Sequence, residues 1–172
     1  NKVKFALMEK GVPFEEVLVH WGGGPEMLAD SPMGKVPYIR TEDGALCESQ
    51  PILEYVEARW PTPALLPADA WQAAKIRELT TFLDLHVELT VRQLYGMAYF
   101  GAPPNPKFCE RVRPQIVKTI EAFKRLARFE PYVGGAQFTM AAHPNALKVT
   151  ADRKADQERA LAASRAKVQG QS

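Results

Sequence analysis

The stretch Met33-Gly-Lys-Val-Pro-Tyr-Ile39, followed by Glu48-Ser49, decides the fold of this chain. Residues 36–39 are rich in side chains that favour a strand, and Glu42-Asp43-Gly44 is typical of a tight turn. Residues 45–47 then return as a second short strand. The sequence therefore predicts a hairpin that runs directly into a helix.

Two polar residues stand at the expected start of that helix. Ser49 precedes an apolar pattern at helical spacing, with Pro51 in the first turn, so we predict that Ser49 is the N-cap. A helix N-terminus favours a carboxylate, and Glu48 beside it can receive an ammonium group. Together they can hold both ends of a zwitterionic amino acid. The alternative is that Ser49 only caps its helix, that Glu48 is solvated, and that nothing binds.

Pro37 is the next informative residue of the hairpin. A proline cannot donate a hydrogen bond to a sheet, so taken alone it predicts the first residue of an edge strand. Its peptide bond would then be trans, because only about 5–6% of X-Pro bonds in folded proteins are cis.

The two segments together resemble a known family. Gly34-Lys35-Val36-Pro37 and the later Leu46-Cys47-Glu48-Ser49-Gln50-Pro51-Ile52-Leu53-Glu54-Tyr55 resemble the glutathione-site segment of the cytosolic, bacterial-type glutathione S-transferases. The resemblance also covers residues 2–14, 131–141 and 145–154, and it is patchy between residues 67 and 129. It therefore touches most of the chain.

The resemblance implies a role for each matching residue. Pro37 would be the family's cis-proline, which leaves the Val36 main chain free to pair with the cysteinyl part of glutathione. Glu48 and Ser49 would hold the γ-glutamyl end, and Lys35 would lie near the glycyl carboxylate. His20 and Trp21 are looser candidates near that loop. For these two we favour the alternative of a strand-end histidine and a packing indole.

The resemblance also implies the fold class. We expect an α/β thioredoxin-like N-terminal domain with a mixed sheet in residues 1–60, and an all-α helical domain in residues 68–172. The Pro-rich residues 61–67 would link them, because prolines end a helix and stiffen the chain.

Two departures from the family pattern shape further expectations. The family's first strand, which carries or precedes the residue that steadies the glutathione thiolate, would come before Asn1, so the catalytic residue is unknown. The acid of a capping box is missing at the third position after Thr139. We therefore expect the working polypeptide to hold a further strand before Asn1, and more helical residues at a gap near residues 141–143.

Residues 71–100 contain no proline and repeat apolar side chains at three- and four-residue steps, which predicts one long helix. A second apolar line, Phe82, Leu85 and Leu89, widens this face and suits either a core or a second subunit. At its end, the resemblance makes Tyr95, Tyr99 and Phe100 candidates for the wall of an electrophile site. Ordinary packing between helices is the alternative for these aromatic residues.

Two more helices are expected towards the C-terminus. Residues 112–127 show helical apolar spacing, and the helix is expected to bend or to start at Pro114. Residues 152–169 are alanine-rich and charged, which favours an exposed helix that frays at its end.

Composition excludes several classes of protein. The chain has 172 residues, 46% of them hydrophobic and 24% charged, with a net charge of +2, so it does not suggest nucleic-acid binding. It has no apolar run long enough to cross a membrane. Cys47 and Cys109 lie far apart and fit reduced cytosolic thiols, and the histidines lack metal-site spacing, so we expect no metal.

The resemblance implies a cytoplasmic, homodimeric enzyme of detoxification that binds glutathione as its cosubstrate and adds the thiolate to a small hydrophobic electrophile. A noncatalytic transferase-fold protein, which uses the same surface for regulation or for binding another protein, is the alternative from a different class.

Overall fold

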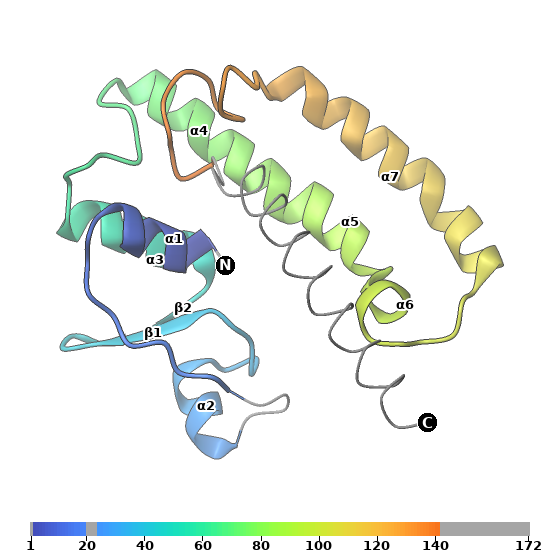
Figure 1. Ribbon diagram of the computed structural model, residues 1–172, viewed down its shortest axis with the longest axis horizontal. Helices are drawn as coiled ribbons and strands as arrows, with labels where there is room; N and C mark the ends of the chain where they lie inside the picture. The colour runs from blue at the N-terminus through green and yellow to red at the C-terminus, as the bar shows by residue number, and fades with distance from the viewer. Residues whose placement is uncertain (1, 20–23, 142–172) are drawn as a thin grey trace, which may run out of the picture. The chain divides into compact units, whose positions relative to one another are not determined.

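The computed structural model describes residues 2–19 and 24–141, all of which belong to one unit. His20, Trp21, His143 and the helix expected over residues 152–169 lie outside the described residues. Figure 1 shows the order of the elements, which are α1 (Lys2–Glu9), α2 (Pro25–Asp30), β1 (Tyr38–Thr41), β2 (Gly44–Cys47), α3 (Ser49–Arg59), α4 (Ala70–Phe82), the π-helix η1 (Leu83–Glu88), α5 (Leu89–Arg92), α6 (Tyr95–Tyr99) and α7 (Pro106–Leu126).

The predicted hairpin is confirmed. Strands β1 and β2 pair in an antiparallel register that sets Tyr38 opposite Cys47 and Thr41 opposite Gly44, so the loop consists of Glu42 and Asp43. Gly44 takes a φ of 126°, which a residue with a side chain rarely adopts. In the part of the chain that the structure describes, the sheet consists of this antiparallel pair, so the mixed sheet expected for residues 1–60 is not found there. Residues 12–19 form no strand.

Helix α3 holds the N-terminal half together. Its Ile52 and Val56 are buried against Val3 and Leu7 of α1. Leu53 belongs to a second cluster that includes Ile76 and Leu79 of α4. Since α3 contributes to both clusters, it connects the hairpin region with the first helix of the all-helical part.

A buried ion pair fixes the segment that follows α3. The Nζ of Lys10 lies 2.7 Å from the Oε2 of Glu57, and the lysine side chain has no exposed surface. The same Nζ donates to the carbonyl oxygens of Trp60 and Pro63, at 2.5 and 2.7 Å. The Glu57 carboxylate also accepts the backbone N–H groups of residues 65 and 66. The Pro-rich segment is therefore held in place against α1 and α3.

The single long helix predicted over residues 71–100 is wrong in its last part. The helical backbone continues from α4 through η1 to Arg92, but a turn at Gln93 and Leu94 separates it from α6. The Leu94 N–H bonds the Val91 carbonyl three residues back, and the Gln93 side chain donates to the carbonyl of Thr90. Because the last carbonyls are satisfied in this way, the helix can end without a glycine or a proline at the break.

Two acidic side chains of the π-helical segment contact different elements. Asp84 pairs with Lys2 of α1 at 2.5 Å, and Glu88 accepts hydrogen bonds from Arg92 and from the hydroxyl of Tyr95. A π-helix adds a residue to the turn and so rotates the side chains that follow it. The segment therefore connects α1 with the helices that lead to α6.

Helix α7 begins at Pro106, well before Pro114, which was one of the two expected positions for its start. The Asn105 side chain accepts the N–H of Phe108 and Pro106 follows at the first helical position, so both N-terminal signals stand well before Pro114. Pro114 lies inside the helix, and Ala127 forms its C-cap. The start at Pro114 is therefore wrong. The helix packs against η1 and α5.

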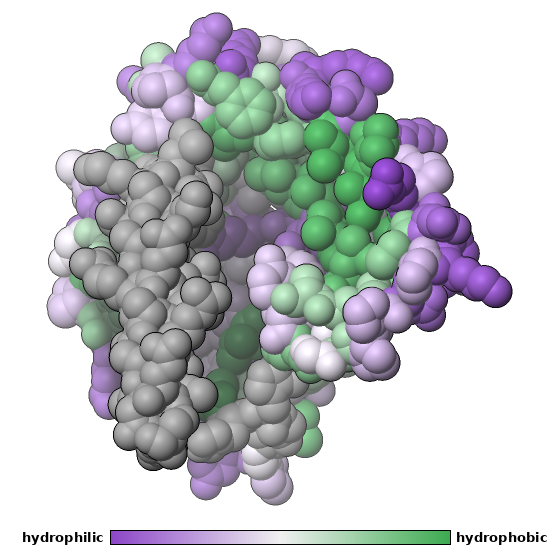
Figure 2. All heavy atoms as spheres, turned by 45° about the vertical axis from the view of Figure 1, so that its right-hand side comes forward, coloured by the Kyte–Doolittle hydropathy of each residue, from purple (hydrophilic) through white to green (hydrophobic). Residues whose placement is uncertain are grey.

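Apolar side chains are not confined to the interior. Leu85 and Leu89 are about half exposed, at 54% and 50%, and Trp71 is exposed as well. Figure 2 shows one face on which apolar side chains gather at the surface.

We expect Glu57→Gln to lower the free energy of unfolding by about 3 kcal/mol, because it leaves the Lys10 ammonium buried without its counter-charge. Urea denaturation checks this. Glu54→Gln, one turn earlier on α3, is the matched control, since its partner Arg77 is well exposed, and it should cost at most about 1 kcal/mol. Equal losses in the two variants would contradict the role given to Glu57.

The Glu54 pair also predicts a dependence on pH. Hydrogen bonds from Arg77 lower the pKa of Glu54 below its ordinary value. Such a group stabilises the fold above its unfolded pKa, and the stabilisation is lost as the pH falls through its folded pKa. The difference in unfolding free energy between the parent and Glu54→Gln should therefore be largest near neutral pH and should shrink as the solution is acidified. A difference that grows in acid would refute this.

Candidate functional site

The register of the hairpin brings the two motifs of the sequence together. Tyr38 is opposite Cys47, and Pro37 precedes Tyr38 while Glu48 follows Cys47. Paired residues of antiparallel strands have Cα atoms about 4.5–5.5 Å apart. The Lys35–Pro37 segment and the start of α3 therefore lie at the same open end of the hairpin, although the whole hairpin separates Pro37 from Glu48 in the sequence.

A buried serine shapes the loop on the β1 side. Ser31 is 2% exposed, and its hydroxyl donates to the Lys35 carbonyl at 2.8 Å and accepts the Lys35 N–H at 3.1 Å. Gly34, with a φ of 59°, donates its N–H to the Ser31 carbonyl. This compact loop presents Lys35 and Val36 to solvent, with Val36 63% exposed. Sequence reasoning missed Ser31, whose only signal was a serine four residues before the motif lysine.

The Val36–Pro37 bond is cis, as the family resemblance implies and contrary to the expectation for Pro37 alone.

The start of α3 corrects the prediction that Ser49 is the N-cap. Glu48 occupies the cap position, its carbonyl accepts the Ile52 N–H at 3.2 Å, and no side chain caps the helix. The physical reason is the backbone of Glu48, whose φ of 67° turns the chain from β2 straight into the helix. Ser49 is therefore the first helical residue.

This helix start has the features of an anion site. Within the described residues, the backbone N–H groups of Ser49 and Gln50 have no hydrogen-bond acceptor. They point out of the helix end, where the dipole adds positive charge. A positive φ at a residue other than glycine costs about 1–3 kcal/mol and persists where the surrounding structure requires it. The Glu48 carboxylate is exposed beside these donors.

Gln50, the residue after Ser49, links the start of α3 to other parts of the fold. Gln50 donates to Glu54 at 3.0 Å and to the sulfur of Met140 at 3.4 Å, while its own Oε1 is buried without a donor among the described residues. Glu54 in turn accepts two hydrogen bonds from Arg77 of α4, each 2.8 Å long. The first turn of α3 is thereby joined to α4.

The three aromatic candidates lie on and just after α6. The rings of Tyr95 and Tyr99 meet edge to face, 5.1 Å apart, and the Tyr95 hydroxyl donates to Glu88 at 2.9 Å. Burial and the hydrogen bond to Glu88 raise the pKa of Tyr95, so its hydroxyl keeps its proton. Tyr99 is 73% exposed and Phe100 is 59% exposed, which is more than packing between helices leaves open. The contacts of Tyr95 tie it to Glu88 and Tyr99 rather than to the hairpin end.

Other chemistry is sparse in the described part of the chain. Residues 2–19 and 24–141 contain no group of three or more His, Cys, Asp or Glu side chains placed to hold a metal ion. Cys47 and Cys109 are both free thiols. None of the helices in these ranges combines the length and the hydropathy needed to span a bilayer.

The hairpin, the cis-proline loop and the uncapped helix start, followed by a set of helices, define a thioredoxin-like domain joined to an all-helical domain. Comparison with known proteins identifies the family. Residues 1–64 match the N-terminal domain of glutathione S-transferases. Glutathione S-transferase 3 of Zea mays is 30% identical over 157 residues, which cover 85% of this chain and 70% of the maize protein. The chain belongs to the glutathione S-transferase family.

Two further relatives are informative. A glutathione S-transferase of Pseudomonas putida is 45% identical over 141 residues, which cover 82% of this chain and 64% of that relative. The chain therefore spans less than two thirds of the length of this relative. The crystal structure of a Sulfitobacter glutathione transferase homolog with bound glutathione superposes with a TM-score of 0.63 at 28% identity, over 81% of this chain and 71% of that one.

Proposed function

We propose that this protein is a glutathione S-transferase that adds the thiolate of glutathione to a small hydrophobic electrophile. The observation that supports this most is the hairpin register, because it sets the exposed residue Val36 beside an uncapped helix start. The Pseudomonas putida relative is named a glutathione S-transferase, and the Sulfitobacter homolog holds glutathione in its crystal structure.

Each part of the tripeptide has a chemically suitable partner. The γ-glutamyl carboxylate would accept the N–H and hydroxyl of Ser49, and its ammonium group would face Glu48. The cysteinyl main chain would pair with Val36 as an added strand next to Pro37. Lys35, exposed at the edge of the same loop, would attract the glycyl carboxylate.

The chemical step is a nucleophilic attack. The thiol releases its proton to solvent, the sulfur of the thiolate forms a bond to the electrophilic carbon, and a leaving group such as chloride departs with the electron pair of the bond that breaks. A hydrogen bond to the thiolate would lower the thiol pKa, and holding both reactants close would remove much of the entropic cost.

The acceptor would lie against Tyr95, Tyr99 and Phe100. Two of these aromatic side chains are largely exposed, as the wall of an open hydrophobic site requires, and Glu88 orients the hydroxyl of the third. A cytoplasmic role in detoxification, which the family resemblance implies, belongs to the same proposal.

Glutathione binding and turnover test the proposal together. Titration calorimetry of the purified chain with glutathione should show binding, and a chloronitroarene should release chloride in its presence faster than with glutathione alone. Binding without turnover, or no binding of glutathione, would refute the transferase and favour the noncatalytic alternative.

We expect Ser49→Ala to weaken glutathione binding by about 1–3 kcal/mol, because the ligand carboxylate loses a buried hydrogen-bond donor. Calorimetry on the variant measures this directly. Ser49→Thr keeps the hydroxyl and serves as the matched control, so it should bind close to the parent. Unchanged affinity in the alanine variant would rule out Ser49 as a glutathione ligand.

We also expect a homodimer. Leu85 and Leu89 extend the apolar face of the helices and remain half exposed, which suits a twofold contact in which α3 of one subunit meets the long helical segment of the other. Sedimentation equilibrium at micromolar concentration should give twice the mass of the chain. Leu89→Glu should shift the protein to monomer, whereas Glu9→Gln, a change on exposed α1 surface, should not. A parent protein that is monomeric throughout this range would contradict the expectation.

A further inference from the structure

A single buried hydroxyl holds the backbone of Lys35 on both sides. Ser31 is 2% exposed, and its side chain donates to the Lys35 carbonyl at 2.8 Å and accepts the Lys35 N–H at 3.1 Å. The two bonded groups belong to the peptide planes before and after the Lys35 Cα atom, so the hydroxyl restricts both backbone dihedral angles of this residue. The direction in which the Lys35 side chain leaves the loop therefore depends on Ser31.

The backbone around Ser31 is itself held in place. The Ser31 N–H donates to the Met27 carbonyl at 2.7 Å, at the end of α2, and the Ser31 carbonyl accepts the Gly34 N–H at 2.7 Å. Asp30, the residue before it, pairs with Arg40 of β1 at 2.5 Å. Helix α2, the loop that follows it and β1 are therefore joined around the buried hydroxyl, which gives that hydroxyl a fixed position.

The Lys35 side chain, in contrast, is held only through its backbone. It is exposed, and its ammonium group forms no hydrogen bond or ion pair within residues 2–19 and 24–141. A lysine has a flexible four-carbon stem and loses rotamer entropy when its charge is placed against a ligand. A fixed backbone reduces the number of positions that the ammonium group can take, so the buried hydroxyl lowers this cost.

We propose that Ser31 is a positioning residue that makes the site selective for the glycyl end of glutathione. It acts through Lys35, because the buried hydroxyl holds the Lys35 backbone and the ammonium group then stays near the glycyl carboxylate of the bound tripeptide. The inference rests on the proposed function and adds a specificity to it, namely a preference for glutathione over γ-glutamylcysteine, which lacks the glycyl residue. The γ-glutamyl end, which Ser49 and Glu48 hold on the other side of the hairpin end, does not depend on Ser31.

Titration calorimetry of the full chain with glutathione and with γ-glutamylcysteine tests the proposal. The parent protein is expected to bind glutathione more tightly than the dipeptide. Ser31→Ala should weaken glutathione binding by about fivefold, the effect of losing one hydrogen bond, and should change the affinity for γ-glutamylcysteine by less than about twofold. Ser31→Cys fills nearly the same space with a weak hydrogen-bonding group, so it should give the same pattern.

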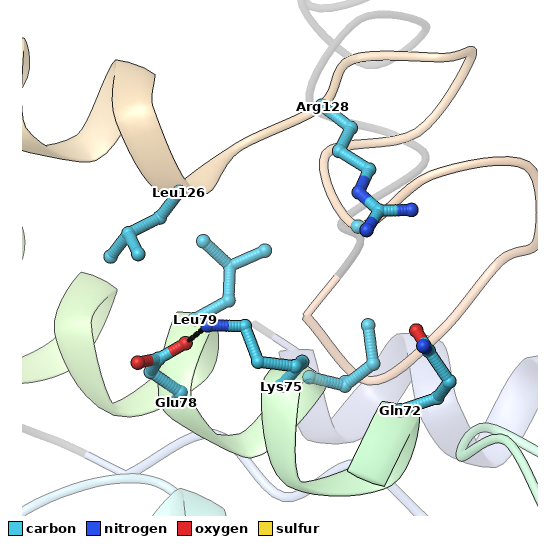
Figure 3. Close-up of a pocket in the computed structure, with 8 residues that line it drawn as sticks. Gln72, Lys75, Glu78, Leu79, Leu126 and Arg128 are labelled. Atoms are coloured by element: carbon cyan, nitrogen blue, oxygen red, sulfur yellow. Dashed lines mark hydrogen bonds and ion pairs between the residues drawn. The ribbon is translucent and has the colours of Figure 1, made fainter. Parts of the chain in front are cut away.

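A double-variant cycle tests whether Ser31 acts through Lys35. Lys35→Gln removes the ammonium group, so it should also weaken the binding of glutathione and spare that of γ-glutamylcysteine. In the double variant the two losses should not add, because Ser31 has nothing left to position once the charge is gone. Lys75→Gln is the matched control, since it makes the same change on α4, where Lys75 is paired with Glu78 (Figure 3), and it should leave both affinities unchanged.

The outcomes distinguish this inference from the proposed function. Ser49→Ala should weaken both ligands, since both carry the γ-glutamyl group. If the parent binds both ligands, the glutathione site stands, and equal affinity for the two, equal losses for the two in Ser31→Ala, or additive losses in the double variant would overturn the role of Ser31. A parent that binds neither ligand would overturn the proposed function and this inference with it. Because the readout is binding, the result does not depend on transferase activity.

Discussion

The pair formed by Lys10 and Glu57 is the constraint on which the arrangement of the N-terminal half depends. One carboxylate accepts the N–H groups of residues 65 and 66 and faces an ammonium group with no exposed surface. That ammonium group donates to the carbonyls of Trp60 and Pro63. Leu65 is buried, and its carbonyl accepts the N–H of Met140. A single buried pair thus holds α1, α3 and the segment after α3 together. Met140 is hydrogen-bonded to that segment.

The candidate glutathione site follows from this arrangement. Helix α3 is buried on two sides and held at its C-terminal end, so its N-terminus stays at the open end of the hairpin. The strained backbone of Glu48 then directs the first N–H groups of the helix outward instead of satisfying them with a cap. Ser31 performs the corresponding task on the other side, by holding the loop that exposes Val36.

In the all-helical part, local sequence did not predict where the helix becomes π-helical or where it ends. The π-helical segment and the turn at Gln93 occur where no proline or glycine interrupts the pattern. Side chains of the π-helical segment form contacts on both sides of it. Asp84 pairs with Lys2 of α1, and Glu88 accepts a hydrogen bond from Tyr95, which lies beyond the turn. Packing of Leu126 at the end of α7 against Ile76 and Leu79 of α4 likewise joins segments that lie far apart in the sequence.

The sequence by itself determined the local elements of this protein. Strand-forming side chains around Glu42-Asp43-Gly44 predicted the hairpin, and helical spacing after Glu48 predicted α3, because these preferences act between neighbours in the chain. Family resemblance added the cis bond before Pro37. Only the tertiary structure decided which residue caps α3, where the long helix breaks, and that Ser31 supports the site. Each of these depends on a backbone angle or on hydrogen bonds between particular atoms, such as Ser31 with Lys35 and Leu94 with Val91, and the residue types along the chain do not specify which of these bonds form.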